Sequence, residues 1–234
     1  MSDPAWLGDL ATTLNDRDVD PATLPRFAAL LELVRDDPTA PTTVTDPAAG
    51  VAAHIADSLD GLTVPAIRHA RTIADLGAGA GFPGLPLALA RPSAHVHLVE
   101  SLSRKCAFLE RVLEVTHTTN ASVACARAEE WSGRDVDVVT VRAVAPLNVL
   151  VEYAAPLLRI GGTLVAWKGR PEADEVADGA AAARTVGLEM GEPIALRPRP
   201  GANHRTLYLY SKVEATPDRF PRRAGMARKR PLSR

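Results

Sequence analysis

Hydrophobic residues follow two different periods along this chain of 234 residues. Short runs that are apolar at nearly every position predict strands buried on both faces, whereas apolar residues spaced three and four apart predict helices. The expected parallel strands lie at residues 71–76, 95–100, 122–126, 135–141 and 163–167. Two further extended runs, 189–196 and 206–210, predict an antiparallel pair at the edge of the same sheet.

Helical patterns separate these strands. One begins in the proline-containing stretch 83–86 and another at Ser103. A third starts at Pro146 and is expected to end at Gly161-Gly162, and a fourth spans 171–186. Strands alternating with helices predict an α/β fold with a doubly wound, Rossmann-like sheet that is mostly parallel and has an antiparallel edge strand.

The first 70 residues carry a helical pattern of their own. Helices are expected from Asp20-Pro21 and from Asp46-Pro47, because proline fits the first helical position after a capping aspartate. The second helix would carry apolar residues on one face, with His54 beside them as a partly buried residue rather than a catalytic group. The predicted organisation is a helical cap (1–70), an α/β core (71–213) and a basic tail (214–234).

The first predicted strand runs directly into a glycine-rich segment. Four glycines, Gly77, Gly79, Gly81 and Gly84, fall within eight residues, and Asp75 precedes the first by two positions. Glycine tolerates positive φ and lets the backbone approach a ligand closely. A strand, a loop and a helix in this order direct backbone N–H groups at a bound ligand. A glycine-rich turn without a ligand is the plainer interpretation, but such a turn needs fewer glycines.

Asp75 distinguishes between two possible ligands. Gly79, Gly81 and Gly84 also match the G-x-G-x-x-G pattern of dinucleotide-binding proteins. A carboxylate at the end of the first strand would repel a pyrophosphate, whereas it complements the ammonium and sulfonium charges of S-adenosylmethionine. We therefore expect S-adenosylmethionine as the cofactor, held by Asp75 and the glycine-rich loop.

Three further candidates follow the predicted strands, at the carboxyl ends where open α/β sheets bind ligands. Glu100, 19 positions after Gly81, is suited to accept hydrogen bonds from ribose hydroxyls. A backbone N–H of Ala128 or Glu129 could meet the adenine edge, although a plain solvated turn fits that pattern equally well. Arg142 follows the fourth strand, and a role in the site is favoured over a surface salt bridge.

The charge of the chain is unevenly distributed. Its net charge is −1, but residues 217–234 hold seven bases and one acid, while residues 1–216 hold 20 bases and 27 acids. A basic arm on an acidic body predicts an anionic partner, most simply nucleic acid. A solvated tail that binds nothing is the alternative.

The two cysteines, Cys106 and Cys125, show neither a C-x-x-C pattern nor metal-ligand spacing. We therefore expect two buried, reduced thiols and no metal. No run reaches the roughly 18 apolar residues of a membrane span, and the acidic N-terminus does not read as a signal peptide. These features predict a cytoplasmic protein. The oligomeric state stays open, with a monomer as the default expectation.

Five segments carry a resemblance to a known family: 54–59, 75–86, 101–105 with 108–109, 141–147 and 168–169. Together they resemble the bacterial family of 16S ribosomal RNA guanine-N7 methyltransferases, also called glucose-inhibited division protein B. The similarity extends over about residues 44–232 and includes parts of the tail. One departure is clear, because members usually carry Asn-Leu-Thr before the His54 helix, where this chain reads Pro-Thr-Thr-Val-Thr at 41–45.

The resemblance implies a class I S-adenosylmethionine-dependent methyltransferase that acts on N7 of a specific guanine, in the 530 loop of 16S ribosomal RNA. That nitrogen has a lone pair and no proton, so in-line transfer needs no general base, and Arg142 is expected to position the reactants. The implied cofactor contacts are Gly77, Phe82, Ala128, Glu129 and Arg142. The implied RNA contacts are Arg104, Lys105, Arg127 and Arg205, with Arg222 and Arg223 in the tail.

Three other functions compete with this one. A small NAD-dependent oxidoreductase would share the fold, but the chain shows no Tyr-x-x-x-Lys pattern and Asp75 opposes it. An RNA-binding module without activity is disfavoured by the intact glycine-rich loop, Glu100 and Arg142. The third alternative is a methyltransferase that acts on another RNA or on a small molecule. The basic tail argues against the small-molecule substrate.

Overall fold

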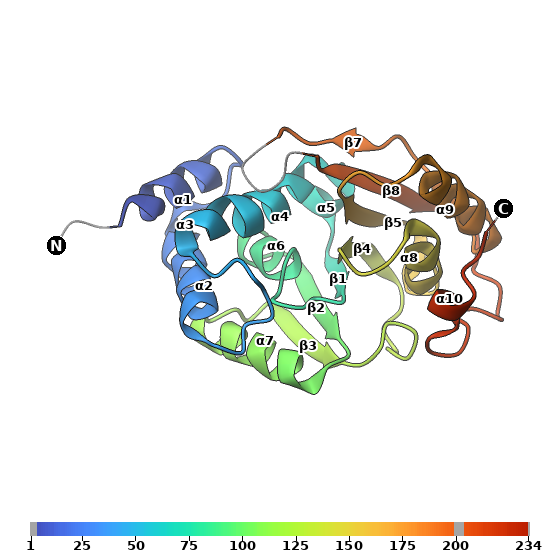
Figure 1. The fold of residues 1–234 in the computed structure, drawn as a ribbon, viewed down its shortest axis with the longest axis horizontal. Coiled ribbons are helices and arrows are strands. Elements are labelled where there is room, and N and C mark those ends of the chain that lie inside the picture. Colours follow the sequence, from blue (N-terminus) through green and yellow to red (C-terminus); the bar gives the residue numbers. More distant parts are fainter. Residues whose placement is uncertain (1–3, 199–203, 234) are drawn as a thin grey trace.

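One mixed sheet runs through the protein, and the computed structural model describes residues 4–198 and 204–233 (Figure 1). Its strands are β1 (Thr72–Leu76), β2 (His95–Glu100), β3 (Ala121–Cys125), β4 (Val136–Arg142), β5 (Leu158–Lys168), β6 (Leu188–Met190), β7 (Ile194–Ala195) and β8 (Thr206–Lys212). The strand order is β3-β2-β1-β4-β5-β8-β6, and β7 pairs with β8. The first five strands are parallel, whereas β8 is antiparallel to β5, β6 and β7. The predicted doubly wound sheet with an antiparallel edge is confirmed.

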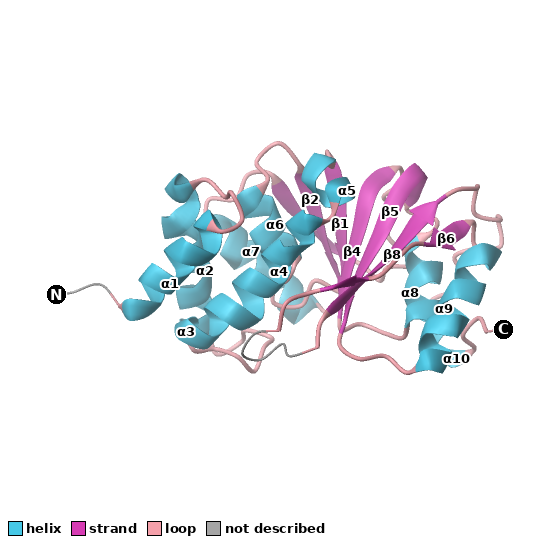
Figure 2. Cartoon of the chain, turned by 90° about the horizontal axis from the view of Figure 1, so that it is seen from above, coloured by secondary structure: helices cyan, strands magenta, loops and turns pink. Residues whose placement is uncertain are grey.

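Helices cover both faces of this sheet, as the view from above shows (Figure 2). The helices are α1 (Ala5–Asn15), α2 (Leu24–Asp36), α3 (Pro47–Gly50), α4 (Asp57–Leu59), α5 (Pro65–His69), α6 (Gly84–Ala90), α7 (Ser103–Val115), α8 (Leu147–Ala154), α9 (Ala173–Thr185) and α10 (Met226–Lys229). Helices α1–α7 lie on one side, and α8, α9 and α10 lie on the other.

Alternate residues of the central strands supply the two halves of the core. Ile73 of β1 belongs to the cluster that contains the N-terminal helices, α6 and α7, whereas its neighbour Ala74 belongs to the cluster around α8 and α9. In β4, Val138 and Val139 divide in the same way. Because both faces of these strands are buried, almost every position is apolar, which is the pattern that the sequence showed.

The helical segment Pro47–Thr63 begins where the sequence predicts. Asp46 accepts a hydrogen bond from the N–H of Ala49 at 2.9 Å, and Pro47 occupies the first helical position. The segment continues as a π-helical stretch (Val51–Ala56), α4 and a 3₁₀ turn (Asp60–Thr63). Val51, Ile55 and Leu59 are buried, as expected. Asp20 similarly caps the 3₁₀ turn Pro21–Thr23 that leads into α2.

One predicted helix end is wrong. Helix α8 begins after Pro146 but ends at Ala154, and Gly161-Gly162 lie inside β5. The pairing of β5 with β4 shifts register between Val136 and Val138, and Gly161 adopts φ of 80° there. The glycine pair therefore serves a bulge in a strand rather than a helix terminus. Among the described residues, no helix is long and apolar enough to cross a membrane.

Candidate active site

The carboxylate of Asp75 holds the glycine-rich loop in place. Its Oδ2 accepts the N–H of Gly84 at 3.0 Å, and its Oδ1 accepts the hydroxyl of Thr140 at 2.9 Å. Thr140 is the register partner of Asp75 on β4. A Cβ atom on Gly84 would lie 2.7 Å from Oδ2, so the close approach requires glycine.

Burial dominates the electrostatics of Asp75. The residue is 1% exposed, and burial raises the pKa of its carboxyl to about 7 against the opposing hydrogen bonds from Thr140 and Gly84. Sequence reasoning expected this carboxylate to face the positive charges of the cofactor. The structure engages both oxygens with the protein, so the residue acts on the loop, and a direct cofactor contact stays a prediction.

The backbone at Gly79 is open to an approaching ligand. Gly79 has φ of 58°, and within the described part of the chain the only atom within 4 Å of a Cβ placed there, beyond its chain neighbours, is the Gly77 carbonyl oxygen at 3.7 Å. The loop is anchored behind this point, because the N–H groups of Gly77 and Ala78 donate to the Val99 carbonyl at 2.8 and 3.1 Å. A cradle with a bare backbone face fits a nucleoside cofactor such as S-adenosylmethionine.

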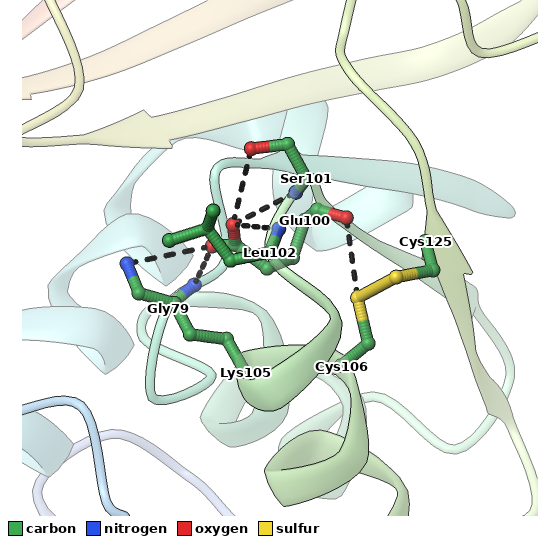
Figure 3. Close-up of a disulfide and its surroundings, with 7 residues drawn as sticks. All are labelled: Gly79, Glu100, Ser101, Leu102, Lys105, Cys106 and Cys125. Atoms are coloured by element: carbon green, nitrogen blue, oxygen red, sulfur yellow. Dashed lines mark hydrogen bonds and ion pairs between the residues drawn. A yellow bond between two sulfur atoms is a disulfide. The ribbon is translucent and has the colours of Figure 1, made fainter.

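Glu100 lies beside this cradle at the end of β2 (Figure 3). Its Oε1 accepts the N–H groups of Ser101 and Leu102 at 2.7 and 3.0 Å. Its Oε2 accepts the N–H of Gly79 at 3.1 Å and lies 3.8 Å from Nζ of Lys105. A carboxylate has about four lone-pair positions, so Oε2 can accept a further donor such as a ribose hydroxyl.

Cys106 and Cys125 form a disulfide, and the prediction of two reduced thiols is wrong (Figure 3). Cys125 pairs in register with Glu100, and the Sγ of Cys106 lies 3.3 Å from the carbonyl oxygen of Glu100. The first turn of α7 therefore returns to the end of β3, with 5.8 Å between the two Cα atoms. The separation of 19 residues along the chain hides this proximity. Cys106 is buried as expected, but Cys125 is exposed.

Phe82 of the loop packs against the cap. Its ring stacks on the imidazole of His54, with centroids 4.2 Å apart and planes inclined by 5°. His54 is 5% exposed, so it is buried more deeply than the partly buried helix histidine that the sequence predicts, and its Nε2 lies 2.9 Å from the Val44 carbonyl oxygen. Burial is the largest influence on its pKa and lowers it, and the charge of Arg142 acts in the same direction. The divergent 41–45 segment thus contacts the His54 ring.

Arg142 joins the core to the cap. From the end of β4 it donates through NH1 to Oδ2 of Asp57 at 2.8 Å and to the Ala53 carbonyl at 3.1 Å. Its guanidinium carbon lies 5.5 Å from the centroid of the Phe82 ring. Arg205 reaches the same carboxylate, with Nε 2.8 Å from Oδ1 of Asp57. The structure thus brings together Phe82, Arg142 and Arg205, three of the predicted site residues.

The remaining candidates lie at the start of α7, around the turn after β3 and in the tail. Ala128 and Glu129 occupy that turn, and Glu129 accepts the N–H of Gly225 at 2.8 Å. Arg222 binds the buried carboxylate of Glu152 through Nε and NH2, at 2.8 and 2.6 Å. The exposed candidates are Arg104, Arg127 and Arg223. The tail therefore docks on the core beside α8, rather than lying free in solvent.

Sequence reasoning missed the importance of Asp57. In the sequence it stands out only as part of the 54–59 family segment, yet it is fully buried and binds two of the predicted site arginines. One signal was available, since an acid falls within a helix whose apolar face carries Ile55 and Leu59. A buried acid needs a charged partner, but the sequence did not show which one.

Solved structures support the fold assignment. The chain is similar to an S-adenosylmethionine-dependent O-methyltransferase from Thermotoga maritima, with 17% identity and a TM-score of 0.52 over 69% of this chain and 66% of that chain. It is also similar to a precorrin-6y C5,15-methyltransferase from Geobacter metallireducens, with 16% identity and a TM-score of 0.50 over 66% and 88% of the two chains. At these identities the likeness concerns the fold, which is that of class I methyltransferases.

Comparisons of the sequence with known families and proteins identify the family. The family model described as rRNA small subunit methyltransferase G matches residues 27–192. Proteins named ribosomal RNA small subunit methyltransferase G from Chloroflexus aggregans and Roseiflexus castenholzii are 43% and 44% identical; each alignment covers 82% of this chain, and it covers 82% and 83% of those proteins. The predictions of an rRNA methyltransferase and of S-adenosylmethionine as its cofactor are confirmed, and the nicotinamide alternative falls away. The chain belongs to the rRNA small subunit methyltransferase G family.

Proposed function

We propose that this protein transfers the methyl group of S-adenosylmethionine to N7 of one guanine in 16S ribosomal RNA. Family membership supplies the reaction class and the small-subunit rRNA substrate. What we propose beyond this is the methylated atom, N7 of guanine, and the mechanism of in-line transfer. The observation that carries it is the arrangement of Arg142 over Phe82, at the carboxyl ends of the strands and beside a glycine-rich loop that Asp75 holds in place.

The cofactor would lie against the open backbone at Gly79, beside Glu100. Bound there, S-adenosylmethionine supplies a methyl group on a positively charged sulfur. Oε2 of Glu100 would accept from a ribose hydroxyl, in place of its long contact with Lys105 at 3.8 Å. The turn at Ala128 and Glu129 would contact the adenine edge with its backbone. Phe82 would cover the reacting end, since it lies between the loop and the cap helix.

Proton transfer is not required for this reaction. Guanine N7 carries a lone pair and no proton, so catalysis depends on holding it in line with the transferable methyl group. In keeping with a reaction that needs no base, two acids at this site already bind groups of the protein: Asp75 binds the loop, and Asp57 binds two arginines. Arg142 would orient the base or a phosphate through its planar guanidinium. A ribosomal substrate would also place the reaction in the cytoplasm.

The proposal can be tested with labelled S-adenosylmethionine and small ribosomal subunits from a strain that lacks the enzyme. We expect label in 16S RNA, at a single guanine where the strand can be cleaved by the chemistry that is specific for 7-methylguanine. Label at a site that resists this cleavage would overturn the N7 assignment. Naked 16S RNA in a parallel reaction shows which form of the substrate is used.

A further inference from the structure

Asp57 is an acidic residue with no exposed surface. Its exposure is 0%, and Ile55 and Leu59, two positions away on either side, are also fully buried. Removing an ionised carboxylate from water costs several kcal/mol unless partners compensate for the lost hydration. A helix that needed only to pack on the sheet would carry an apolar residue at this position.

The partners of Asp57 come from two strands that lie far apart in the sequence. Oδ2 accepts from Arg142 at the end of β4, and Oδ1 accepts from Arg205 immediately before β8, both at 2.8 Å. The Asp57 backbone carbonyl accepts the indole N–H of Trp167 on β5 at 2.9 Å. Each carboxylate oxygen thus holds one guanidinium, and the helix is fixed to the strand between them.

The same helix also fixes the surroundings of Arg142. The Ala53 carbonyl accepts a second hydrogen bond from NH1 of Arg142, and the His54 ring stacks on Phe82, over which the guanidinium lies. One carboxylate between two guanidiniums leaves one positive charge in excess. A free arginine side chain loses rotamer entropy when it is immobilised, so an arginine that is held in place before substrate arrives loses less on binding it.

We propose that Asp57 is a positioning residue of the methyl transfer reaction, which acts by holding Arg142 over Phe82 and Arg205 beside it. The inference rests on the proposed function, because Arg142 must contact the reactants for its position to matter. Asp57 itself has no exposed atom with which to touch substrate or cofactor. Its effect on catalysis should therefore pass through the arginines, and chiefly through Arg142, whose guanidinium lies over Phe82.

A double-mutant cycle on kcat/KM with small ribosomal subunits tests this. Asp57→Asn keeps the shape of the side chain and removes its charge, and we expect kcat/KM to fall by about 10–100-fold, as when a residue that orients an active-site group is lost. In the Arg142→Ala background, the same change should lower kcat/KM by less than about threefold, since interacting residues give non-additive effects. Asp57→Glu retains the charge, so its kcat/KM should fall less than that of Asp57→Asn. If Asp57→Asn does not fold, Asp57→Glu takes its place in the cycle.

Asp60→Asn is the matched control. Asp60 lies one turn further along the same segment and pairs at 2.8 Å with Arg17 at the end of α1, away from Arg142. Its loss should lower the unfolding temperature and leave kcat/KM of the folded protein within about twofold. Equal losses from Asp57→Asn with and without Arg142 would overturn the positioning role. Wild-type protein that transfers no label to 16S RNA would instead overturn the proposed function, so the two failures are distinguishable.

Discussion

The imidazole of His54 lies flat against the phenyl ring of Phe82, with ring centroids 4.2 Å apart. This contact connects the cap to the loop that would hold the cofactor, since His54 belongs to the Pro47–Thr63 segment and Phe82 follows directly after Gly81. A disturbance of the cap should therefore reach the loop through this pair of rings.

Protonation of His54 should weaken the fold at acidic pH. Burial lowers the pKa of His54 below its ordinary value near 6.5. The contribution of the neutral ring to stability is therefore complete above about pH 6.5 and is lost as the pH falls through the lower folded-state pKa. His54→Phe keeps a stacking ring that cannot be protonated.

The test compares thermal unfolding of the wild type and His54→Phe from pH 5 to 8. The variant loses the hydrogen bond to Val44, so its unfolding temperature can be lower throughout, but it should fall less steeply toward pH 5. Parallel curves for the two proteins would contradict the prediction.

Asp75 should give the opposite pH dependence. Burial raises its pKa to about 7, so the stability that the protonated carboxyl contributes is complete below about pH 4 and is lost as the pH rises through about 7. Asp75→Asn can accept from the Gly84 N–H with its oxygen and donate to Thr140 with its amide, which preserves both contacts. The urea midpoint of this variant should not fall between pH 4 and 8 as that of the wild type does.

Asp75→Ala serves as the comparison for the hydrogen bonds themselves. It leaves the Gly84 N–H unpaired and should lower the free energy of unfolding by about 1–3 kcal/mol below about pH 4, where the carboxyl of the wild type is protonated. An asparagine variant as unstable as the alanine variant would show that the charge, not the shape, supports the loop.

Reduction of the Cys106–Cys125 disulfide should destabilise the protein. Closing a loop of this length restricts the unfolded chain, and the expected loss on reduction is about 3 kcal/mol. Urea unfolding with and without a thiol reductant measures it, and the double variant Cys106→Ser, Cys125→Ser provides the control that the reductant should not affect. Equal midpoints in both buffers would refute the prediction.

The basic tail should contribute salt-dependent affinity through its exposed charges only. Three basic residues of the tail are exposed: Arg223, Lys229 and Arg230. Each phosphate contact contributes about 0.9 to the slope of a plot of log affinity for duplex RNA against log salt concentration. Replacing all three with glutamine should therefore reduce that slope by up to about 2–3. Filter binding at several salt concentrations would measure it.

Arg222→Gln is the matched control within the same tail. Its guanidinium is bound to Glu152, whose side chain is 1% exposed, so the change should lower the free energy of unfolding by about 1–3 kcal/mol with little effect on the slope. If the triple variant keeps the wild-type slope, these three exposed charges do not contact RNA.

Local signals in the sequence were sufficient for much of the fold. Asp46-Pro47 marks a helix start because the cap and the helix are neighbours in the chain, and the apolar run of β4 reflects burial on both faces. The partners of Asp57, by contrast, lie 85 and 148 residues away. The disulfide likewise depends on how α7 returns to β3. Such contacts are decided by the assembled sheet, which the order of residues does not display.

The docked tail has a consequence for the order in which the protein folds during its synthesis. Arg228 donates to the carbonyl of Val144, and Asn148 donates to that of Leu232. These contacts fix the loop after β4 and the start of α8, close to Arg142 in the chain. A nascent protein is made from its N-terminus onward. The segment that follows Arg142 therefore gains this support only after residues 228–232 have been synthesised and have docked, so a shorter, unfinished chain lacks it.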